Sequence, residues 1–220
     1  MIKSNNSFSQ MNAEDVNEIH SDDFCKAFRQ RSDTLTLVSQ LNHLIKAVQK
    51  HRGMSMAMLG GNSAFVGEFE VLQKQLEKRL ATLETFARET GGILSEKDKE
   101  NLHLAWQTIR HNWEDDKVND NFALHSHFVE QLHGMTYSLA KQLERPLASE
   151  LIEQGDAAQQ SQKSVTYPRM FKKIELLNFV AKQLPEMIER LAQVRGLSTY
   201  AAATGEVNYE SDRKMRYLMQ

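Results

Sequence analysis

The chain has 220 residues, of which 40% are hydrophobic and 25% are charged, a composition typical of a globular protein with one large or two small domains. Its formal net charge of −2, without a dense Lys/Arg block, argues against nucleic acid as a partner. We find neither an apolar leader nor a run of roughly 18 to 20 apolar residues. We therefore expect no membrane partner and, with the single Cys25, a cytoplasmic location.

The low content of chain-breaking residues predicts helices, since only 3 Pro and 10 Gly are present. Residues 1–20 are polar and aperiodic and are predicted to be a flexible N-terminal tail. A first helix is expected from about Ser21 to the glycine pair before Asn62. Further apolar stripes predict helices over about 63–90, over about 95–113 with Ser95 as cap, and after a turn at 114–121. Residues 21–153 are thus predicted to form a first helical bundle.

The second half of the chain is predicted to add an incomplete bundle. Residues 154–167 are rich in Gln and Ser and are predicted to be a linker. Residues 168–220 are then expected to hold a long helix bent at Pro185 and a short last helix. The predicted fold class is all-α, an up-down helical bundle with a partial second bundle sharing long helices.

An Arg-Gly-x-Ser step occurs twice, at Arg52–Ser55 and at Arg195–Ser198, 143 residues apart (195 minus 52). At about 100° per residue, Arg52 lies within roughly 40° of Val48 on its apolar stripe. By the same arithmetic Arg195 lies within about 40° of Leu191. Both arginines are therefore predicted to project into the core, where a guanidinium needs an anionic partner.

Two kinds of partner satisfy a buried guanidinium. One is an Asp or Glu from another helix, because neither stripe carries an acid within one turn, and Glu189 lies about 120° from the second arginine. The other is a small planar oxyanion, which accepts two parallel hydrogen bonds from the guanidinium fork. In the second case Gly53 and Gly196 would permit close approach, and Ser55 and Ser198 would add hydroxyl donors.

The two steps have a counterpart in a known family. The stretch Gln49–Ser55 (QKHRGMS) resembles the nitrate- and nitrite-sensing (NIT) domain, and Gln193–Ser198 (QVRGLS) resembles the second arginine motif of that family. NIT domains are all-helical, contain two helical bundles, and bind nitrate or nitrite with one arginine from each motif. The resemblance therefore implies Arg52 and Arg195 as the ligand-binding pair, with nitrate or nitrite as ligand and no cofactor.

The resemblance covers about 41–90 and 187–205 most closely, and the sequence departs from the family at two points. His51 stands where the family usually has Glu before the first arginine. Only 25 residues follow Arg195 (220 minus 195), fewer than the complete second bundle of the family needs. We therefore expect a fragment of a longer sensor or a shortened relative.

Other patterns predict no metal and no catalysis. Glu100-x-x-His103 and Glu130-x-x-His133 have the spacing of di-iron bundles, but the helical wheel turns both carboxylates outward. His125 is predicted to lie at the edge of the core. Without a phosphate loop or a nucleophile elbow, no catalytic residue and no enzyme activity are expected.

The sequence therefore predicts a cytoplasmic signal-transduction module that binds a small inorganic anion and signals by helix rearrangement. The predicted ligand-binding residues are Arg52, Gly53, Ser55, Arg195, Gly196 and Ser198. A homodimer or a downstream regulatory protein is expected to receive the signal. The alternative is a structural or protein–protein adaptor bundle whose arginines are paired internally.

Overall fold

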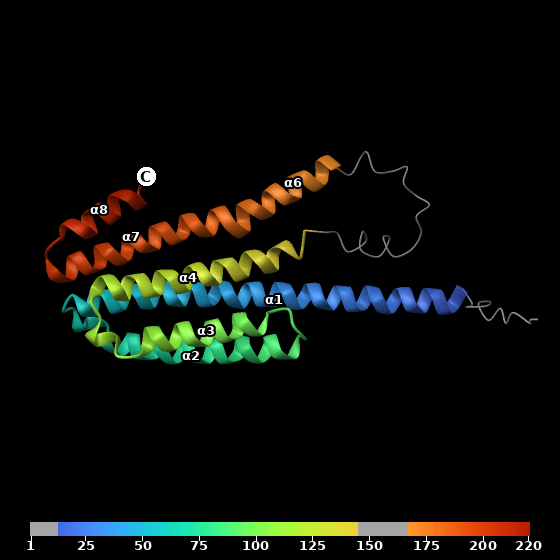
Figure 1. Cartoon of the computed structure of the whole chain (residues 1–220), viewed down its shortest axis with the longest axis horizontal. Coiled ribbons are helices and arrows are strands. Elements are labelled where there is room, and N and C mark those ends of the chain that lie inside the picture. The colour runs from blue at the N-terminus through green and yellow to red at the C-terminus, as the bar shows by residue number, and fades with distance from the viewer. Residues whose placement is uncertain (1–12, 145–166) are drawn as a thin grey trace, which may run out of the picture.

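The computed structural model describes residues 13–144 and 167–220, and these residues form helices and short connections (Figure 1). The elements are α1 (Ala13–Leu59), η1 (Ser63–Phe65), α2 (Val66–Glu89), α3 (Glu96–Arg110), η2 (Trp113–Asp115), α4 (Val118–Lys141), α6 (Tyr167–Asn178), η4 (Phe179–Gln183), α7 (Leu184–Thr204) and α8 (Tyr209–Leu218). No strand occurs among the described residues, which confirms the predicted all-α fold. None of the helices in these two ranges combines the length and apolar character needed to cross a bilayer.

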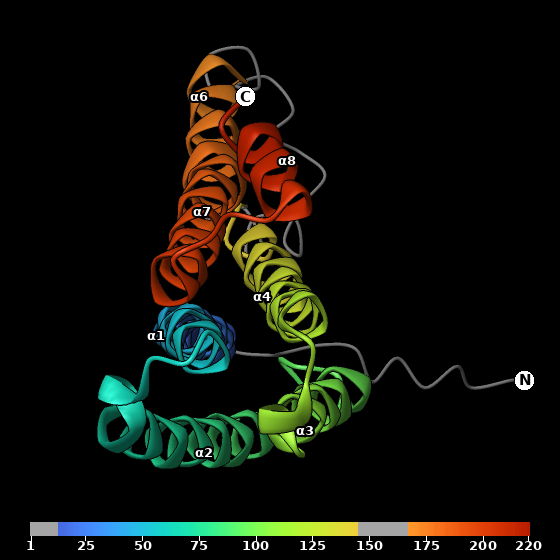
Figure 2. The same ribbon diagram turned by 90° about the vertical axis from the view of Figure 1, so that its left-hand side faces the viewer.

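Helices α1 and α4 lie side by side at the centre of the molecule and are shared by two groups of helices (Figure 2). On one side α2 and α3 complete an up-down bundle with them. On the other side the nearly continuous helix of α6, η4 and α7 packs against both, and α8 folds back along α7 (Figure 1). This arrangement confirms the predicted bundle with a partial second bundle that shares long helices.

The core of the first group consists of apolar side chains spaced three or four residues apart on each helix. Its fully or almost fully buried members include Leu37, Leu41, Leu44 and Val48 of α1, Leu72, Leu76, Leu80 and Leu83 of α2, Leu102 and Ile109 of α3, and Phe128, Leu132 and Leu139 of α4. Each such side chain contributes roughly 1.5–3 kcal/mol by leaving water. This burial fixes the rotation of α1 and therefore the direction of the polar side chains farther along its stripe.

The helix ends follow local sequence signals. Helix α1 ends at the predicted glycines, where Gly61 takes a left-handed φ of 91° and the Asn62 amide donates to the Ala57 carbonyl. The Ser95 side chain caps α3 by accepting from the Asp98 amide, as predicted. The start of α1 differs from the prediction, because helix already covers 13–20 of the expected tail.

The helix-forming residues at the start of α1, such as Ala and Glu, explain the difference, since they favour helix without an apolar period. The rest of the predicted tail, 1–12, lies outside the described residues. So does the predicted linker except for Tyr167, which begins α6.

The bend predicted at Pro185 takes the form of the π-helical turn η4. The Leu184 amide donates to the Phe179 carbonyl, five residues back rather than four. Proline has no amide hydrogen, and its ring clashes with the carbonyl four residues before it, which here belongs to Ala181. The wider turn relieves that clash and sets how α7 is rotated relative to α6.

Candidate functional site

Arg52 is the largest fully buried side chain among the described residues, with an exposed fraction of 0%. It lies near the C-terminal end of α1, one turn beyond the buried Val48. The prediction that this arginine projects into the core is confirmed. Its guanidinium also lies over the Phe122 ring, 5.4 Å from the ring centroid, which adds an apolar wall on the α4 side.

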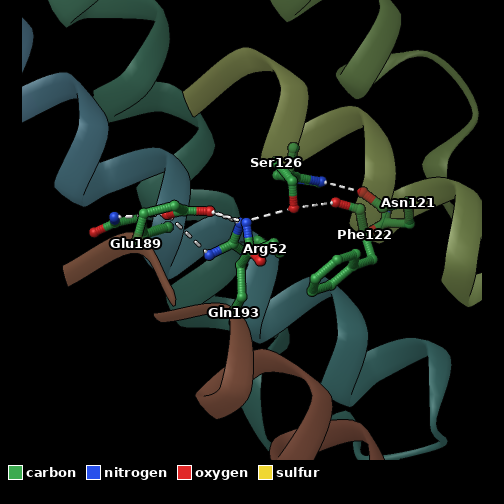
Figure 3. A network of polar contacts seen from close by, with 8 residues as sticks. Arg52, Asn121, Phe122, Ser126, Glu189 and Gln193 are labelled. Carbon is green, nitrogen blue, oxygen red and sulfur yellow. Dashed lines mark hydrogen bonds and ion pairs between the residues drawn. The ribbon is translucent and has the colours of Figure 1, made fainter. Parts of the chain in front are cut away.

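The partner of Arg52 is Glu189 of α7 (Figure 3). Nη1 of the arginine lies 2.5 Å from Oε1 of the carboxylate, and Nη2 lies 3.3 Å from Oε2. The side-chain amides of Gln49 and Gln193 each donate to this carboxylate at 2.8 Å. Arg52 Nη1 also donates to the Ser126 hydroxyl of α4 at 3.0 Å. The site is thus a planar carboxylate held by several N–H donors, with the guanidinium fork as the main one.

The second predicted arginine does not reach this site. Arg195 is exposed on α7, so the prediction that both guanidinium groups converge in the core is wrong for the described form. The residue that faces α1 instead is Gly196, where an added Cβ would lie 3.9 Å from Arg52 Nε and 3.1 Å from Met56 Sδ. Because Glu189 already neutralises Arg52, a second buried guanidinium would be uncompensated, and water solvates it at lower cost.

The predicted serines also separate. Ser198 is exposed, and its hydroxyl lies 3.6 Å from Met215 Sδ, so it has no part in the Arg52 site. Ser55 is buried, but its hydroxyl lies 2.7 Å from Asn121 Oδ1 and 3.0 Å from the Arg52 carbonyl. Ser55 therefore joins α1 to α4 beside the site and does not contact the guanidinium.

The predicted glycines have different surroundings. The close approach predicted at Gly196 is confirmed, since α1 side chains leave little space there. At Gly53 the described residues leave open space, with nothing within 4 Å of an added Cβ. No other helix therefore packs closely against Gly53 in the described structure.

Two buried histidines, His51 of α1 and His125 of α4, form a pair beside Arg52, and the sequence did not predict this pair. Nδ1 of His51 is 2.7 Å from Nε2 of His125, and Nδ1 of His125 is 2.7 Å from the Asn121 carbonyl. A carbonyl only accepts, so His125 carries its proton on Nδ1 and accepts from His51 through Nε2. This assignment leaves Nε2 of His51 as an acceptor without a partner among the described residues.

Both histidines are neutral in the folded protein. Burial, together with the smaller effect of the Arg52 charge, lowers the pKa of His125 to about 4, although the hydrogen bond to the Asn121 carbonyl opposes the shift. Burial, followed by the proximity of His125, lowers the pKa of His51 well below its ordinary value. The charge balance of the site is therefore set by Arg52 and Glu189 alone. The position of His51 seven residues after the buried Leu44 was the sequence signal for its burial.

A pocket of about 660 Å³ opens between α4 and α7 beside the ion pair. Its lining includes Ser126, Glu189 and Gln193 of the site together with His133. Burial lowers the pKa of His133, and the carboxylates of Glu189, Glu186 and Glu130 oppose that shift. The pocket gives solutes a route to the carboxylate, which is itself 8% exposed.

The described residues hold no group of three or more His, Cys, Asp or Glu side chains arranged to bind a metal ion. Glu100 and Glu130 both lie exposed, in the direction that the helical wheel predicts. Comparisons of the chain with family models, with curated proteins and with solved structures found no match.

Proposed function

We propose that the chain is a sensory helical module that binds a small planar oxyanion, nitrate or nitrite, at Arg52. The observation that carries this proposal is the fully buried guanidinium whose two Nη atoms face a planar carboxylate. Nitrate and nitrite offer the same pair of coplanar oxygen acceptors to the fork. The NIT resemblance of Gln49–Ser55 agrees with this assignment.

In this proposal the described form is the ligand-free one, and Glu189 occupies the place of the anion. A buried guanidinium without a partner is costly by several kcal/mol, so Arg52 retains one anion in either state. The ligand therefore exchanges with Glu189, whose carboxylate moves into the adjoining pocket beside Lys182 and Arg190. Such an internal competitor reduces the apparent affinity to the intrinsic affinity multiplied by the fraction of molecules in which Glu189 has left Arg52.

The ligand would meet one further donor. Nε of Arg52 is buried without a hydrogen-bond partner among the described residues. Buried donors of this kind are rare in proteins and mark places where a water, ion or ligand is to be expected. An oxyanion bound side-on, to Nε and one Nη atom, or a group brought to the adjacent Gly196 position, would satisfy it.

Calorimetric titration of the full chain with nitrate, nitrite, chloride and sulfate at constant ionic strength tests the proposal. We expect saturable heat with nitrate or nitrite that is lost in Arg52→Lys, which keeps the charge but not the planar fork. Glu189→Gln is expected to bind about ten-fold more tightly, because the internal competitor is gone. Glu186→Gln, which changes another carboxylate of the same pocket, is the matched control.

Absence of heat up to millimolar nitrate in both the natural chain and Glu189→Gln would overturn the proposal. In that case the second candidate, a protein–protein adaptor, takes its place. It is favoured by the internal pairing of Arg52 and by a row of exposed apolar side chains on α6, η4 and α7. These are Leu176, Phe179, Val180, Leu184, Met187, Ile188 and Leu191.

Under either function we place the chain in the cytoplasm, where its exposed, unpaired Cys25 thiol stays reduced. As a sensor it would pass the signal to a second copy of itself or to a downstream regulatory protein through movement of α7 against α1.

A further inference from the structure

A heptad stripe runs through α6, η4 and α7, but its side chains face the rest of the molecule only as far as η4. The stripe, spaced alternately three and four residues, comprises Ile174, Leu177, Ala181, Leu184, Ile188, Leu191, Arg195, Ser198 and Ala202. The members up to Ala181 are buried or half-buried, whereas every member from Leu184 onward is exposed. Beyond η4 the residues of the heptad stripe therefore do not form the face of α7 that packs against the other helices.

The disagreement is a displacement by one residue. Most inward positions of α7 directly follow an exposed member of the stripe. They include Pro185, Glu189, Ala192, Gly196 and Ala203, all buried or half-buried, and the buried Leu197 is an exception. A π turn holds one residue more than an α turn, so it advances the chain by one position relative to a regular helix. Without η4, each exposed stripe residue would take the place of the residue that follows it.

We propose that η4 is a register switch for the anion site. In the bound state the π turn becomes α-helical, and α7 turns by one residue, about 100° with a shift of about 1.5 Å. Arg195 then takes the place of Gly196 beside Arg52, while Glu189 moves to the exposed place of Arg190. This inference rests on the proposed function for the identity of the anion, and on the stripe for the movement.

The contacts of α7 tolerate the second register. Helix α7 lies close to the chain at Gly60, directly after α1, where an added Cβ would lie 2.7 Å from Ala203 Cβ. Ala202 would replace Ala203 there, so the same small side chain keeps the approach possible. At the place of Gly196 the nearest atom to a new Cβ is Met56 Sδ, at 3.1 Å, the end of a flexible side chain.

Opposing contributions to the free energy leave the choice between the two registers of α7 to the bound anion. Leu184, Ile188 and Leu191 would leave water in the second register, which favours it. Leu197 would move from its buried place to the exposed place of Ser198, and the Pro185 ring would again meet the Ala181 carbonyl, which both disfavour it. Two buried guanidinium groups without Glu189 would repel each other, which disfavours it strongly in the absence of a ligand. A bound oxyanion removes that repulsion and bridges both arginines. The bound anion therefore selects the register in which the apolar stripe is buried.

Thiol labelling of single-cysteine variants of the full chain measures the register. In a Cys25→Ser background, the Leu191→Cys thiol sits at a position now 71% exposed, which takes the place of Ala192, 8% exposed, after the switch. The Met187→Cys thiol is the matched control, because it moves from one exposed position to another, that of Ile188. We expect nitrate to slow labelling of the Leu191→Cys thiol about ten-fold and to leave the control unchanged.

Two backbone variants bias the switch without touching the ligand site. Pro185→Ala removes the ring clash and restores an amide donor, which lowers the cost of the second register, so the Leu191→Cys thiol is expected to be partly protected even without nitrate. Deletion of the exposed Gln183 removes the surplus residue and locks α7 in the register of the structure, so nitrate should no longer protect. Circular dichroism shows whether each variant keeps its helices.

The outcomes separate the two proposals. Nitrate heat in calorimetry with no change of labelling in any variant overturns the register switch and leaves the anion site standing. Protection by Pro185→Ala without nitrate heat supports the switch and removes nitrate as its ligand. Nitrate protection that persists after deletion of Gln183 overturns the switch, because that variant has no residue to release.

Discussion

Arg52 and Glu189 pair across α1 and α7 although 137 residues separate them, with Nη1 2.5 Å from Oε1 and Nη2 3.3 Å from Oε2. The arginine is completely buried and the carboxylate nearly so. The pair therefore ties the last long helix of the chain to the first one. Under the proposed function it would also make the free energy of unfolding depend on which anion is available to Arg52.

We expect Glu189→Gln to lower the free energy of unfolding in chloride by about 3–5 kcal/mol, because it leaves a buried guanidinium uncompensated. Nitrate should restore more stability to this variant than to the natural chain, since it binds the folded form in place of the carboxylate. Urea unfolding in chloride and in nitrate at equal ionic strength measures both effects. Glu186→Gln, an exposed site on the same helix, should change stability by less than about 0.5 kcal/mol. An equal loss in both salts would contradict the anion proposal.

The histidine pair predicts acid sensitivity. The folded pKa of His125 is about 4, below the ordinary value of 6.5, so between these two pH values the unfolded chain binds a proton that the folded chain does not. Stability is therefore complete above about pH 6.5 and falls as the pH drops toward 4, by on the order of 3 kcal/mol. His51, whose pKa is also lowered, adds to the loss in the same direction.

Urea unfolding at several pH values measures this slope. His125→Gln should reduce this slope, because one of the two titrating histidines is gone. His127→Gln, which changes an exposed histidine on the same helix, should leave the slope as it is. The assignment fails if the natural chain and His125→Gln show the same dependence on pH.

Substitution of Gly53 in α1 and of Gly60, directly after its last residue, should have opposite effects. Gly60→Ala places a methyl group 2.7 Å from Ala203 Cβ and 3.3 Å from the Ala57 carbonyl oxygen, so we expect a loss of about 1–3 kcal/mol. Gly53→Ala meets nothing within 4 Å in the described structure and removes a flexible residue from a helix interior. It should gain about 0.5–1 kcal/mol. Thermal unfolding of the two variants distinguishes these outcomes, and a loss in both would contradict the helix spacing.

Ser55→Ala tests whether the hydrogen bond between α1 and α4 or direct ligand contact explains this serine's place in the motif. Its hydroxyl joins Asn121 at 2.7 Å and does not contact the guanidinium, so we expect a stability loss of about 1–3 kcal/mol. Nitrate affinity in calorimetry should stay within about two-fold of the natural chain, because no ligand donor is lost. A selective loss of affinity without a loss of stability would place the hydroxyl on the ligand instead.

The sequence predicted the first bundle well because its helices are determined by residue patterns within each helix and by capping residues at the helix ends. Leucines such as Leu72, Leu76 and Leu83 repeat at helical spacing, and burial of that stripe leaves each helix one favourable rotation. The glycines after Leu59 and the Ser95 cap act through the backbone of their own turn, so the predicted ends at these positions were accurate.

The second arginine was misplaced because a helical wheel gives only the angles between residues of one helix. It places Arg195 near Leu191 correctly, but the rule that the largest apolar residues face inward fails beyond η4. The rotation of α7 depends on Pro185 and on the distant pairing of Glu189 with Arg52, neither of which a stripe records. The available sequence signal for this rotation was Glu189, which directly follows Ile188 of the apolar heptad stripe.

Helix α1 spans 47 residues in one unbroken piece, and Arg52 lies near one end of it. From there to Ala13 the helix axis extends for roughly 60 Å. A tilt of only about 5° at the ion pair would therefore displace the far end by about 5 Å, as a lever arm does. Under the proposed function, the length of this one helix would convert an exchange of anions at a single side chain into a displacement large enough for another protein to detect.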